Sequence, residues 1–291
     1  MKPLPPTAAR MAPEQANAQT TIRGLMDAAL AMGVSPNEAR SLLTHATGWR
    51  REVLLAFDER QVDAGAQADF LRMASARAAG EPLAYLVGVR EFFSRRFRVA
   101  PGVLIPRPET ELLVEFALER AQPKARVLDL GTGSGAIAVT IAAERSDLAV
   151  HACDISQRAL EIARDNNLRL AQGRVHIFMS DWFAQIPAEE RFDVMVSNPP
   201  YIRAADPHLN QGDLRFEPPD ALTDHSDGLA AVRILVRDGH GHLAPGGWFA
   251  VEHGYDQAGA VRELLRGVGY TDVASRTDLA GIERISIGKR V

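Results

Sequence analysis

The segment Ser197-Asn198-Pro199-Pro200-Tyr201 places a side-chain amide, two prolines and an aromatic ring in succession. It follows an apolar run at residues 192–196, which predicts a buried strand that the prolines then end. Proline biases the residue before it toward an extended conformation, so the segment is stiff. The side-chain carbonyl of Asn198 and the backbone carbonyl of Pro199 both accept hydrogen bonds. The segment therefore suits holding a planar –NH2 group, and a strand stop with a core tyrosine is the alternative for the motif alone.

A glycine-rich turn, Gly131-Thr132-Gly133-Ser134-Gly135, lies between an expected strand at residues 126–130 and an expected helix from Ala136. Glycine allows tight turns and close approach of a ligand, and the helix N-terminus attracts negative charge. The spacing is G-x-G-x-G and not the G-x-G-x-x-G of dinucleotide loops. We therefore expect a nucleoside ligand without a pyrophosphate, such as S-adenosylmethionine, with its carboxylate near these amides.

Acidic residues end the next two expected strands. Asp154 follows the strand at residues 149–153, about 20 residues past the glycine turn, where a carboxylate can bind ribose hydroxyls. Asp181 and Trp182 follow the strand at residues 175–179, where an acceptor and an aromatic ring suit an adenine. The alternative for Asp154 is a helix cap, and the alternative for Trp182 is packing in the core. We expect Phe183 to pack in the core.

Strands and helices alternate from Arg126 onward, which predicts a doubly wound α/β sheet of seven strands. Because ligands bind at the carboxyl ends of such strands, these motifs should share one edge of the sheet. Thr110 is expected to cap the helix that carries Leu112 and Phe116. Glu252, at the end of a later strand, is interpreted as structural support, and Arg215 is expected to pair with Glu217.

Apolar residues recur at helical spacing over residues 20–85, which predicts a small helical domain. Ser35 to Glu38 reads as a capping box with proline at the first helical position. Residues 80–85 break the pattern, and two short β-like runs at residues 87–93 and 95–99 predict a hairpin linker over residues 86–108. The sheet domain is expected over residues 109–291, and residues 1–19 read as a disordered leader.

Composition places the chain among ordinary globular proteins: 291 residues, 46% hydrophobic, with a net charge of −4. This charge argues against a dedicated nucleic-acid binder. The single cysteine, Cys153, excludes an internal disulfide and fits a reducing cytoplasm. No apolar run is long enough to cross a membrane, and no histidine pattern indicates a metal site. Arg95, Arg96 and Arg98 most simply form the wet face of a strand.

Beyond these general motifs, several segments together resemble the peptide chain release factor glutamine N5-methyltransferase family. The likeness runs from about residue 20 to the end, in the family's own order. The segments are Gly80 to Tyr85, Gly88 to Phe92, Leu104 to Glu111, Asp129 to Gly135, Asn198 to Tyr201 and Phe216 to Pro218.

The resemblance implies a class I S-adenosylmethionine-dependent methyltransferase, with a Rossmann-like sheet domain joined by a β-hairpin to an all-α domain. It implies methyl transfer to the glutamine side chain of the Gly-Gly-Gln tripeptide in bacterial class 1 release factors. The helical domain would dock the release factor. The cofactor would contact residues 131–135, Asp154, Asp181, Trp182 and Asn198, and the substrate would contact residues 198–201. Asn198, Pro199 and Tyr201 would be catalytic, and we expect a monomer.

Two other functions fit parts of this pattern. An N6-adenine nucleic-acid methyltransferase would use the same acceptor motif on a flipped base, against which the acidic charge balance counts. A non-catalytic protein that keeps the cofactor fold is the second, and the intact acidic residues count against it.

Overall fold

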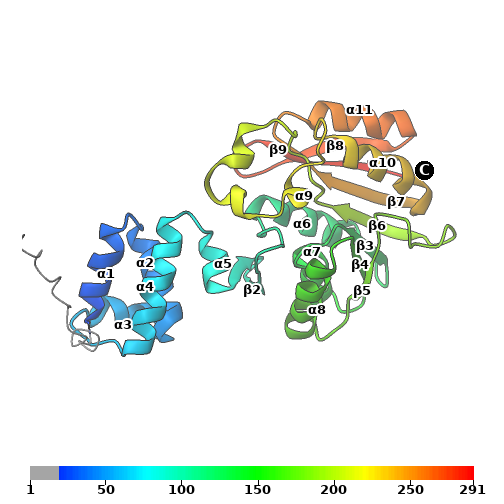
Figure 1. Ribbon diagram of the computed structural model, residues 1–291. Helices are drawn as coiled ribbons and strands as arrows, with labels where there is room; N and C mark the ends of the chain where they lie inside the picture. The colour runs from blue at the N-terminus through cyan, green and yellow to red at the C-terminus, as the bar shows by residue number, and fades with distance from the viewer. Residues whose placement is uncertain (1–19) are drawn as a thin grey trace, which may run out of the picture. The chain divides into compact units, whose positions relative to one another are not determined.

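The computed structural model describes residues 20–291, so the leader expected at residues 1–19 lies outside the described part. The chain divides between Val87 and Gly88 into two compact units. The described part of the first unit is helical, and the second unit contains a seven-stranded sheet (Figure 1). We call them the helical domain and the sheet domain.

The helical domain packs its helices around one apolar core that includes Leu25, Leu42 and Phe70. Ser35 caps the second helix, and its hydroxyl and backbone form the expected capping box with Glu38. The helices are α1 (Ile22–Ala31), α2 (Pro36–Thr47), α3 (Arg51–Ala56), α4 (Ala64–Ala78) and α5 (Leu83–Val87).

Helix α5 corrects the sequence analysis, which expected residues 80–85 to break the helical pattern and a strand to begin at Val87. Leu83, Leu86 and Val87 pack against the helical core, and burying them on one side favours a further helical turn. The first strand begins only at Val89.

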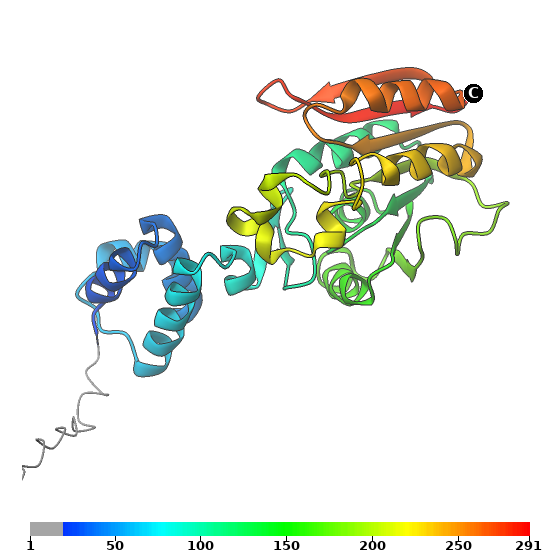
Figure 2. The same ribbon diagram turned by 45° about the horizontal axis from the view of Figure 1, so that its top comes forward.

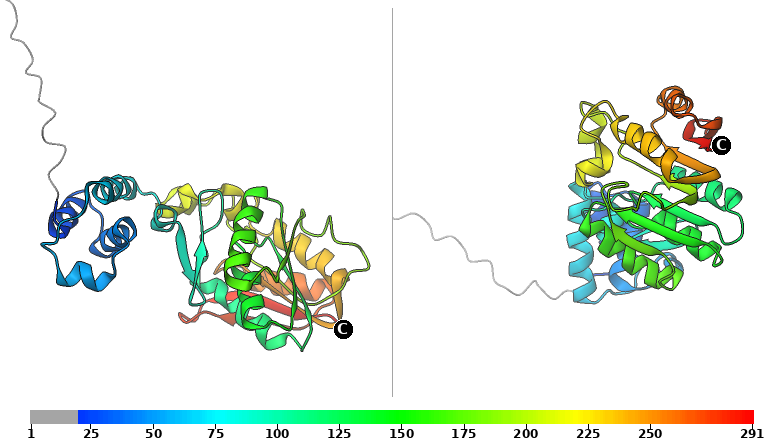
Figure 3. Two further views of the ribbon diagram at one scale, coloured as in Figure 1. Left: turned by 90° about the horizontal axis from the view of Figure 1, so that it is seen from below. Right: turned by 90° about the vertical axis from the view of Figure 1, so that its right-hand side faces the viewer.

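The hairpin consists of β1 (Val89–Phe92) and β2 (Arg95–Arg98), paired antiparallel. Phe93 and Ser94 have φ angles of 49° and 57°, the left-handed conformation that a tight two-residue hairpin turn requires. Strand β2 runs alongside helix α8 (Figure 3), where the Arg98 N–H donates to Asn166 Oδ1 at 2.8 Å. Arg96 and Arg98 lie on the exposed face of β2, as expected, whereas Arg95 is on the same side as the buried Phe97 and forms an ion pair with Glu144.

The large sheet has the strand order β5-β4-β3-β6-β7-β9-β8, which confirms the predicted seven-stranded α/β fold. The first five strands are parallel, and β9 runs antiparallel between β7 and β8. The strands are β3 (Arg126–Leu130), β4 (Ala149–Asp154), β5 (His176–Met179), β6 (Phe192–Ser197), β7 (Leu243–Glu252), β8 (Thr271–Thr277) and β9 (Glu283–Lys289).

Helices cover both faces of this sheet (Figure 2). One face packs against α6 (Glu111–Arg120), α7 (Ala136–Glu144) and α8 (Gln157–Ala171). The other packs against α10 (Ala230–His242) and α11 (Ala258–Val268). The short helices are η2 (Pro108–Thr110), η3 (Pro207–Asn210), η4 (Gly212–Phe216) and α9 (Pro219–Leu222).

Thr110 does not act as the predicted helix cap. Its backbone is already helical, and its side chain makes no capping hydrogen bond to α6. The hydroxyl instead donates to Glu252 Oε2 at 2.7 Å. A hydroxyl donates only one hydrogen bond. The Thr110 hydroxyl donates it to the carboxylate, because a buried carboxylate is a strong acceptor.

Candidate active site

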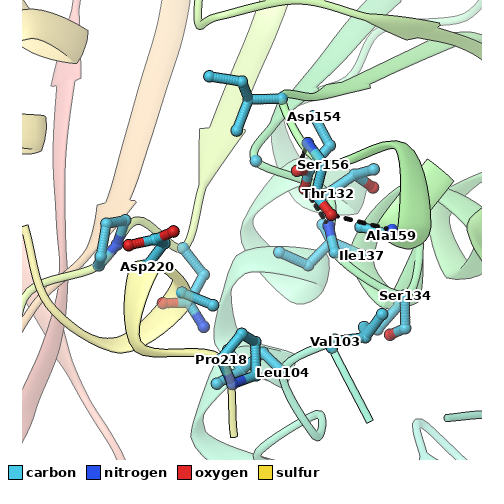
Figure 4. A pocket seen from close by; sticks show the side chains of 18 of the residues that line it. Val103, Leu104, Thr132, Ser134, Ile137, Asp154, Ser156, Ala159, Pro218 and Asp220 are labelled. Carbon is cyan, nitrogen blue, oxygen red and sulfur yellow. Dashed lines mark hydrogen bonds between the residues drawn. The ribbon is translucent and has the colours of Figure 1, made fainter. Parts of the chain in front are cut away.

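A cavity of about 580 Å³ opens at the carboxyl ends of β3, β4, β5 and β6. Strand β3 lies between β4 and β6, so the order of strands reverses here. Ligands of open α/β sheets bind at such reversals, and the volume is that of a small-molecule site. Figure 4 shows Thr132, Asp154 and Ser156 on one side of the cavity, facing Pro218 and Asp220 on the other.

The glycine turn needs glycine for two separate reasons. Gly131, Gly133 and Gly135 all have positive φ, at 72°, 57° and 82°. A side chain on Gly135 would also lie 3.1 Å from Val139 and 3.2 Å from Ala163, so it would wedge α7 away from α8. Both the turn and the packing of the two helices therefore depend on the absence of a Cβ atom.

The turn is tied to β4 by its own backbone. The N–H groups of Gly131 and Thr132 both donate to the Cys153 carbonyl at 2.9 Å. The Gly133 N–H donates to Asp154 Oδ2 at 2.8 Å. The sequence analysis expected these amides to face a ligand carboxylate, but in the structure these three hold the turn in shape.

Asp154 ends β4 and lines the cavity. Its Oδ1 accepts the Ser156 N–H at 2.9 Å, and its Oδ2 accepts the Gly133 N–H. The cap of α8 is Ser156 and not Asp154, since the Ser156 hydroxyl accepts the Ala159 N–H. Burial raises the pKa of Asp154, while these two N–H donors oppose the rise. Each carboxylate oxygen has a further lone pair, so Asp154 is still able to accept a ribose hydroxyl.

Asp129 is fully buried beneath the turn. Its Oδ2 accepts the Thr132 hydroxyl at 2.6 Å and the Ala138 N–H at 3.2 Å. Burial raises its pKa to about 7. Its Oδ1 has no hydrogen-bond partner within residues 20–291. A buried carboxylate oxygen without a donor is costly, which agrees with the raised pKa of this group.

Asp181 and Trp182 follow β5 and line the cavity beside Gly131. A Cβ atom on Gly131 would lie 3.3 Å from the Trp182 ring, so the indole packs directly on the turn. Phe183 points elsewhere and stacks on His242, with ring centroids 5.0 Å apart. Phe183 thus belongs to the core, as predicted, while its two neighbours face the cavity.

Asn198 and Pro200 line the cavity after β6, whereas Pro199 and Tyr201 are not among the lining residues. Asn198 Nδ2 donates to Thr110 Oγ1 at 3.0 Å. The Tyr201 hydroxyl donates to Glu252 Oε1 at 3.1 Å.

Glu252 is the last residue of β7, and its carboxylate accepts hydrogen bonds from both Thr110 and Tyr201. Its side chain is buried, with 2% of the residue exposed. Burial raises its pKa to about 7, and the Thr110 and Tyr201 hydroxyls oppose that rise. Sequence analysis assigned Glu252 only to structural support and did not connect it with Thr110. The one available signal was that Thr110 lies in the resembling segment Leu104 to Glu111.

Beside Pro218, which lines the cavity, Glu217 connects two loops that are far apart in the sequence. The buried carboxylate of Glu217 accepts the Ile105 N–H at 2.9 Å and forms an ion pair with Arg107. This corrects the sequence analysis, which paired Glu217 with its near neighbour Arg215. The Arg215 guanidinium instead lies over the Phe216 ring. The pairing follows from burial, because a buried carboxylate needs donors that the fold brings to it.

The described residues fit a nucleoside ligand better than a metal ion. Two carboxylates, of Asp154 and Asp181, and the indole of Trp182 line one cavity. Across residues 20–291, no three His, Cys, Asp or Glu side chains are grouped to hold a metal ion. Over the same residues, no helix has the length and apolarity to cross a membrane.

Comparison with known proteins gives two family matches. A family model described as methyltransferase small domain matches residues 108–212. A second, described as PrmC N-terminal domain, matches residues 26–88.

Curated relatives match both domains at once. The release factor glutamine methyltransferase of Burkholderia pseudomallei (strain K96243) is 54% identical over 259 residues, which cover 87% of this chain and 91% of that protein. The chain belongs to the release factor glutamine methyltransferase family. A second member, from Bordetella pertussis (strain Tohama I), is 52% identical and covers 88% of this chain and 95% of that protein.

The release factor glutamine methyltransferase family uses S-adenosylmethionine, so the resemblance and the cofactor predicted from the motifs are both confirmed. The fold has solved counterparts as well. A methyltransferase from Pyrococcus furiosus has a TM-score of 0.52 at 20% identity, over 68% of this chain and 90% of that chain. At that identity the likeness concerns the fold alone.

Proposed function

We propose that this enzyme transfers a methyl group from S-adenosylmethionine to the side-chain amide nitrogen of glutamine in the Gly-Gly-Gln tripeptide of class 1 release factors. The curated relatives support the reaction and the substrate class. The observation that carries the chemistry is the placement of Asn198 at the cavity with its amino group turned toward Thr110. Its carbonyl oxygen is thereby left to accept from a substrate.

The reacting nitrogen is a poor nucleophile because its lone pair is delocalised into the adjacent carbonyl. When bound, S-adenosylmethionine supplies a methyl group on a positively charged sulfur. Asn198 Oδ1 and the Pro199 carbonyl would accept the two N–H bonds of the glutamine amide, which directs its lone pair at that methyl group. The same two acceptors stabilise the positive charge that grows on nitrogen.

The proton balance needs no strong base. As the new C–N bond forms, the C–S bond breaks and its electron pair stays on sulfur. The nitrogen then carries two protons and a methyl group, is strongly acidic, and releases one proton to water. The product is a neutral methylated amide. Tyr201 would pack on the substrate side chain from its anchored position against Glu252.

We assign the cofactor contacts to residues 131–135, Asp154, Asp181, Trp182 and Asn198. All of these except Gly135 line the cavity. Gly135 acts through the packing of α7 on α8.

We assign docking of the release factor to the helical domain. The PrmC N-terminal domain match over residues 26–88 supports this, because it is separate from the methyltransferase match over residues 108–212. Leu55 and Phe57 are each 60% exposed on this domain. Exposed apolar side chains of this size are suited to a protein partner. We further propose a cytoplasmic monomer that contacts no nucleic acid; the buried thiol of Cys153 fits a reducing compartment.

A methyl-transfer assay tests the function directly. The enzyme is given labelled S-adenosylmethionine with folded class 1 release factor in one tube and duplex DNA in another. We expect label only in the release factor, on the glutamine of Gly-Gly-Gln by mass spectrometry. Label only in DNA would establish the adenine methyltransferase instead. Label on another residue of the release factor would overturn the site assignment.

A further inference from the structure

Two segments that are far from β7 in the sequence reach the buried carboxylate of Glu252. Thr110, which is 4% exposed, comes from the start of α6, and Asn198 and Tyr201 come from the loop after β6. The contacts are Thr110 Oγ1 to Glu252 Oε2 at 2.7 Å, Tyr201 Oη to Glu252 Oε1 at 3.1 Å, and Asn198 Nδ2 to Thr110 Oγ1 at 3.0 Å. The three bonds form one chain that ends at the reacting edge of the cavity.

The direction of each bond in this chain follows from the chemistry of its groups. Above its pKa of about 7 the Glu252 carboxylate is ionised and only accepts, so both hydroxyls donate to it. A hydroxyl can donate only one hydrogen bond. Because Thr110 donates its hydrogen bond to Glu252, it can only accept from Asn198. The group of Asn198 that faces Thr110 is therefore the amino group. The side-chain carbonyl of Asn198 must then point away from Thr110.

This direction matters because the two ends of the Asn198 amide have opposite effects on a substrate amide. In the observed orientation, Oδ1 can accept from the –NH2 group of glutamine. In the flipped orientation, an amino group would meet an amino group, and neither could accept from the other. Asn198 has almost the same shape both ways, so packing alone does not select between them. The hydrogen bond to Thr110 selects the orientation, because Thr110 can only accept from Asn198.

We propose that Thr110 and Glu252 are positioning residues that fix the amide orientation of Asn198, so that an acceptor and not a donor meets the substrate nitrogen. The proposal rests on the proposed function, since it assumes that an amide –NH2 group is the substrate. Glu252 makes Thr110 a donor toward it, Thr110 is then an acceptor for the amino group of Asn198, and the carbonyl oxygen of Asn198 faces the substrate. Tyr201 shares the same carboxylate, so its ring is anchored by the same group.

The first test removes the Thr110 hydroxyl and keeps the shape of the side chain. Thr110→Val replaces the hydroxyl by a methyl group, so Asn198 loses its acceptor. We expect kcat for release factor methylation to fall at least tenfold, with the Kd for S-adenosylmethionine changed less than threefold. Thr110→Ser restores the hydroxyl and should recover most of the loss. The matched control is Thr140→Val, which deletes a buried hydroxyl that bonds only within α7, and it should keep the kcat of the parent.

The second test asks whether Thr110 acts through Asn198. If it does, Thr110→Val should cost nothing further in an Asn198→Ala background, since no amide remains to be oriented. Glu252→Gln keeps the size of the side chain but offers one acceptor where two are needed. Measured at pH 8.5, above the Glu252 pKa of about 7, it should also lower kcat at least tenfold.

The outcomes separate this inference from the proposed function. If the parent enzyme does not methylate release factor, the proposed function fails. If the parent is active and Thr110→Val keeps its kcat, only the inference fails. The inference also fails if Thr110→Val acts equally strongly with and without Asn198, or if the loss appears mainly in the cofactor Kd. Should Thr110→Val not fold, Glu252→Gln decides by the same criteria.

Discussion

The two domains differ in whether they bury polar side chains. Every buried polar or charged side chain among residues 20–291 lies in the sheet domain, between Thr110 and Ser286. The core of the helical domain is formed by apolar residues such as Leu42 and Phe70. Both domains expose some large apolar side chains, such as Leu55 and Phe57 in the helical domain and Leu168 in the sheet domain. The contrast therefore lies in the two interiors: the sheet domain adds buried polar groups to its apolar core, and the core of the helical domain is apolar.

The difference fits the separate roles that we propose for the two domains. Burying a carboxyl group is costly unless donors surround it, and Asp129 and Glu252 both lie buried next to the cavity with pKa values raised to about 7. Such groups weaken a core and are retained where they orient reacting parts. An apolar core without them gives stability, which suits the docking role that we propose for the helical domain.

The largest expected effect tests whether the domains are separable. Phe70→Ala opens a cavity in the helical core and should destabilise that domain by roughly 3–5 kcal/mol. Hydrogen exchange should show faster exchange in residues 20–87, while S-adenosylmethionine binding stays unchanged. Leu30→Ala, at an exposed position of α1, is the control and should change little. Loss of cofactor binding in Phe70→Ala would show that the domains depend on each other.

The next effect tests the polar interior of the sheet domain. Asn198→Ala removes the acceptor for the substrate amide and should lower kcat about 10²–10³-fold, or about 3–4 kcal/mol in the barrier. The Kd for S-adenosylmethionine, measured by calorimetry, should change far less. Asn37→Ala, at an exposed position of α2, is the matched control. Turnover near the parent value in Asn198→Ala would reject the role of this residue.

A pH effect of similar size follows from Glu252. Its pKa is about 7 in the folded protein and near 4.5 when unfolded, so the folded state holds a proton that the unfolded state has released between these values. Stability from this group is therefore complete below pH 4.5 and is lost as pH rises to 7, by roughly 3 kcal/mol. Glu252→Gln cannot titrate.

Denaturant unfolding of both proteins across this pH range measures the effect. The free energy of unfolding of the parent should fall relative to Glu252→Gln as pH rises. A difference between the two proteins that stays constant over the range would contradict the raised pKa.

The smallest effect tests the surface of the helical domain. Replacing Leu55 and Phe57 by serine should raise the KM for release factor about tenfold, or about 1.4 kcal/mol. We expect kcat and cofactor affinity to stay unchanged, because both depend on the sheet domain. Leu168→Ser, at an exposed position of α8, is the control. An equal rise in KM for the control would remove the distinction between the two surfaces.

Much of the site was visible in the sequence because its parts are local. The turn at residues 131–135, Asp154, Asp181 and Asn198 each follow an apolar strand directly. In a parallel sheet the carboxyl ends of strands share one edge, so chain order and strand periodicity suffice to bring these residues together. The family segments are equally local. The helical turn at residues 83–87 was missed because its stability comes from packing on α2 and α4, which no short pattern reports.

What only the tertiary structure decided is how these parts are oriented. Thr110 and Glu252 are 142 residues apart, Asn198 is 88 residues from Thr110, and Glu217 meets Ile105 across 112 residues. Each of these contacts exists because a buried polar atom must find a partner, and the partner is whichever donor the packed sheet and loops bring within 3 Å. Residue types and spacing determined which chemical groups this protein has at its sheet edge. The direction in which Asn198 presents its amide depends on a buried acid whose proximity arises only when the strands and α6 have packed.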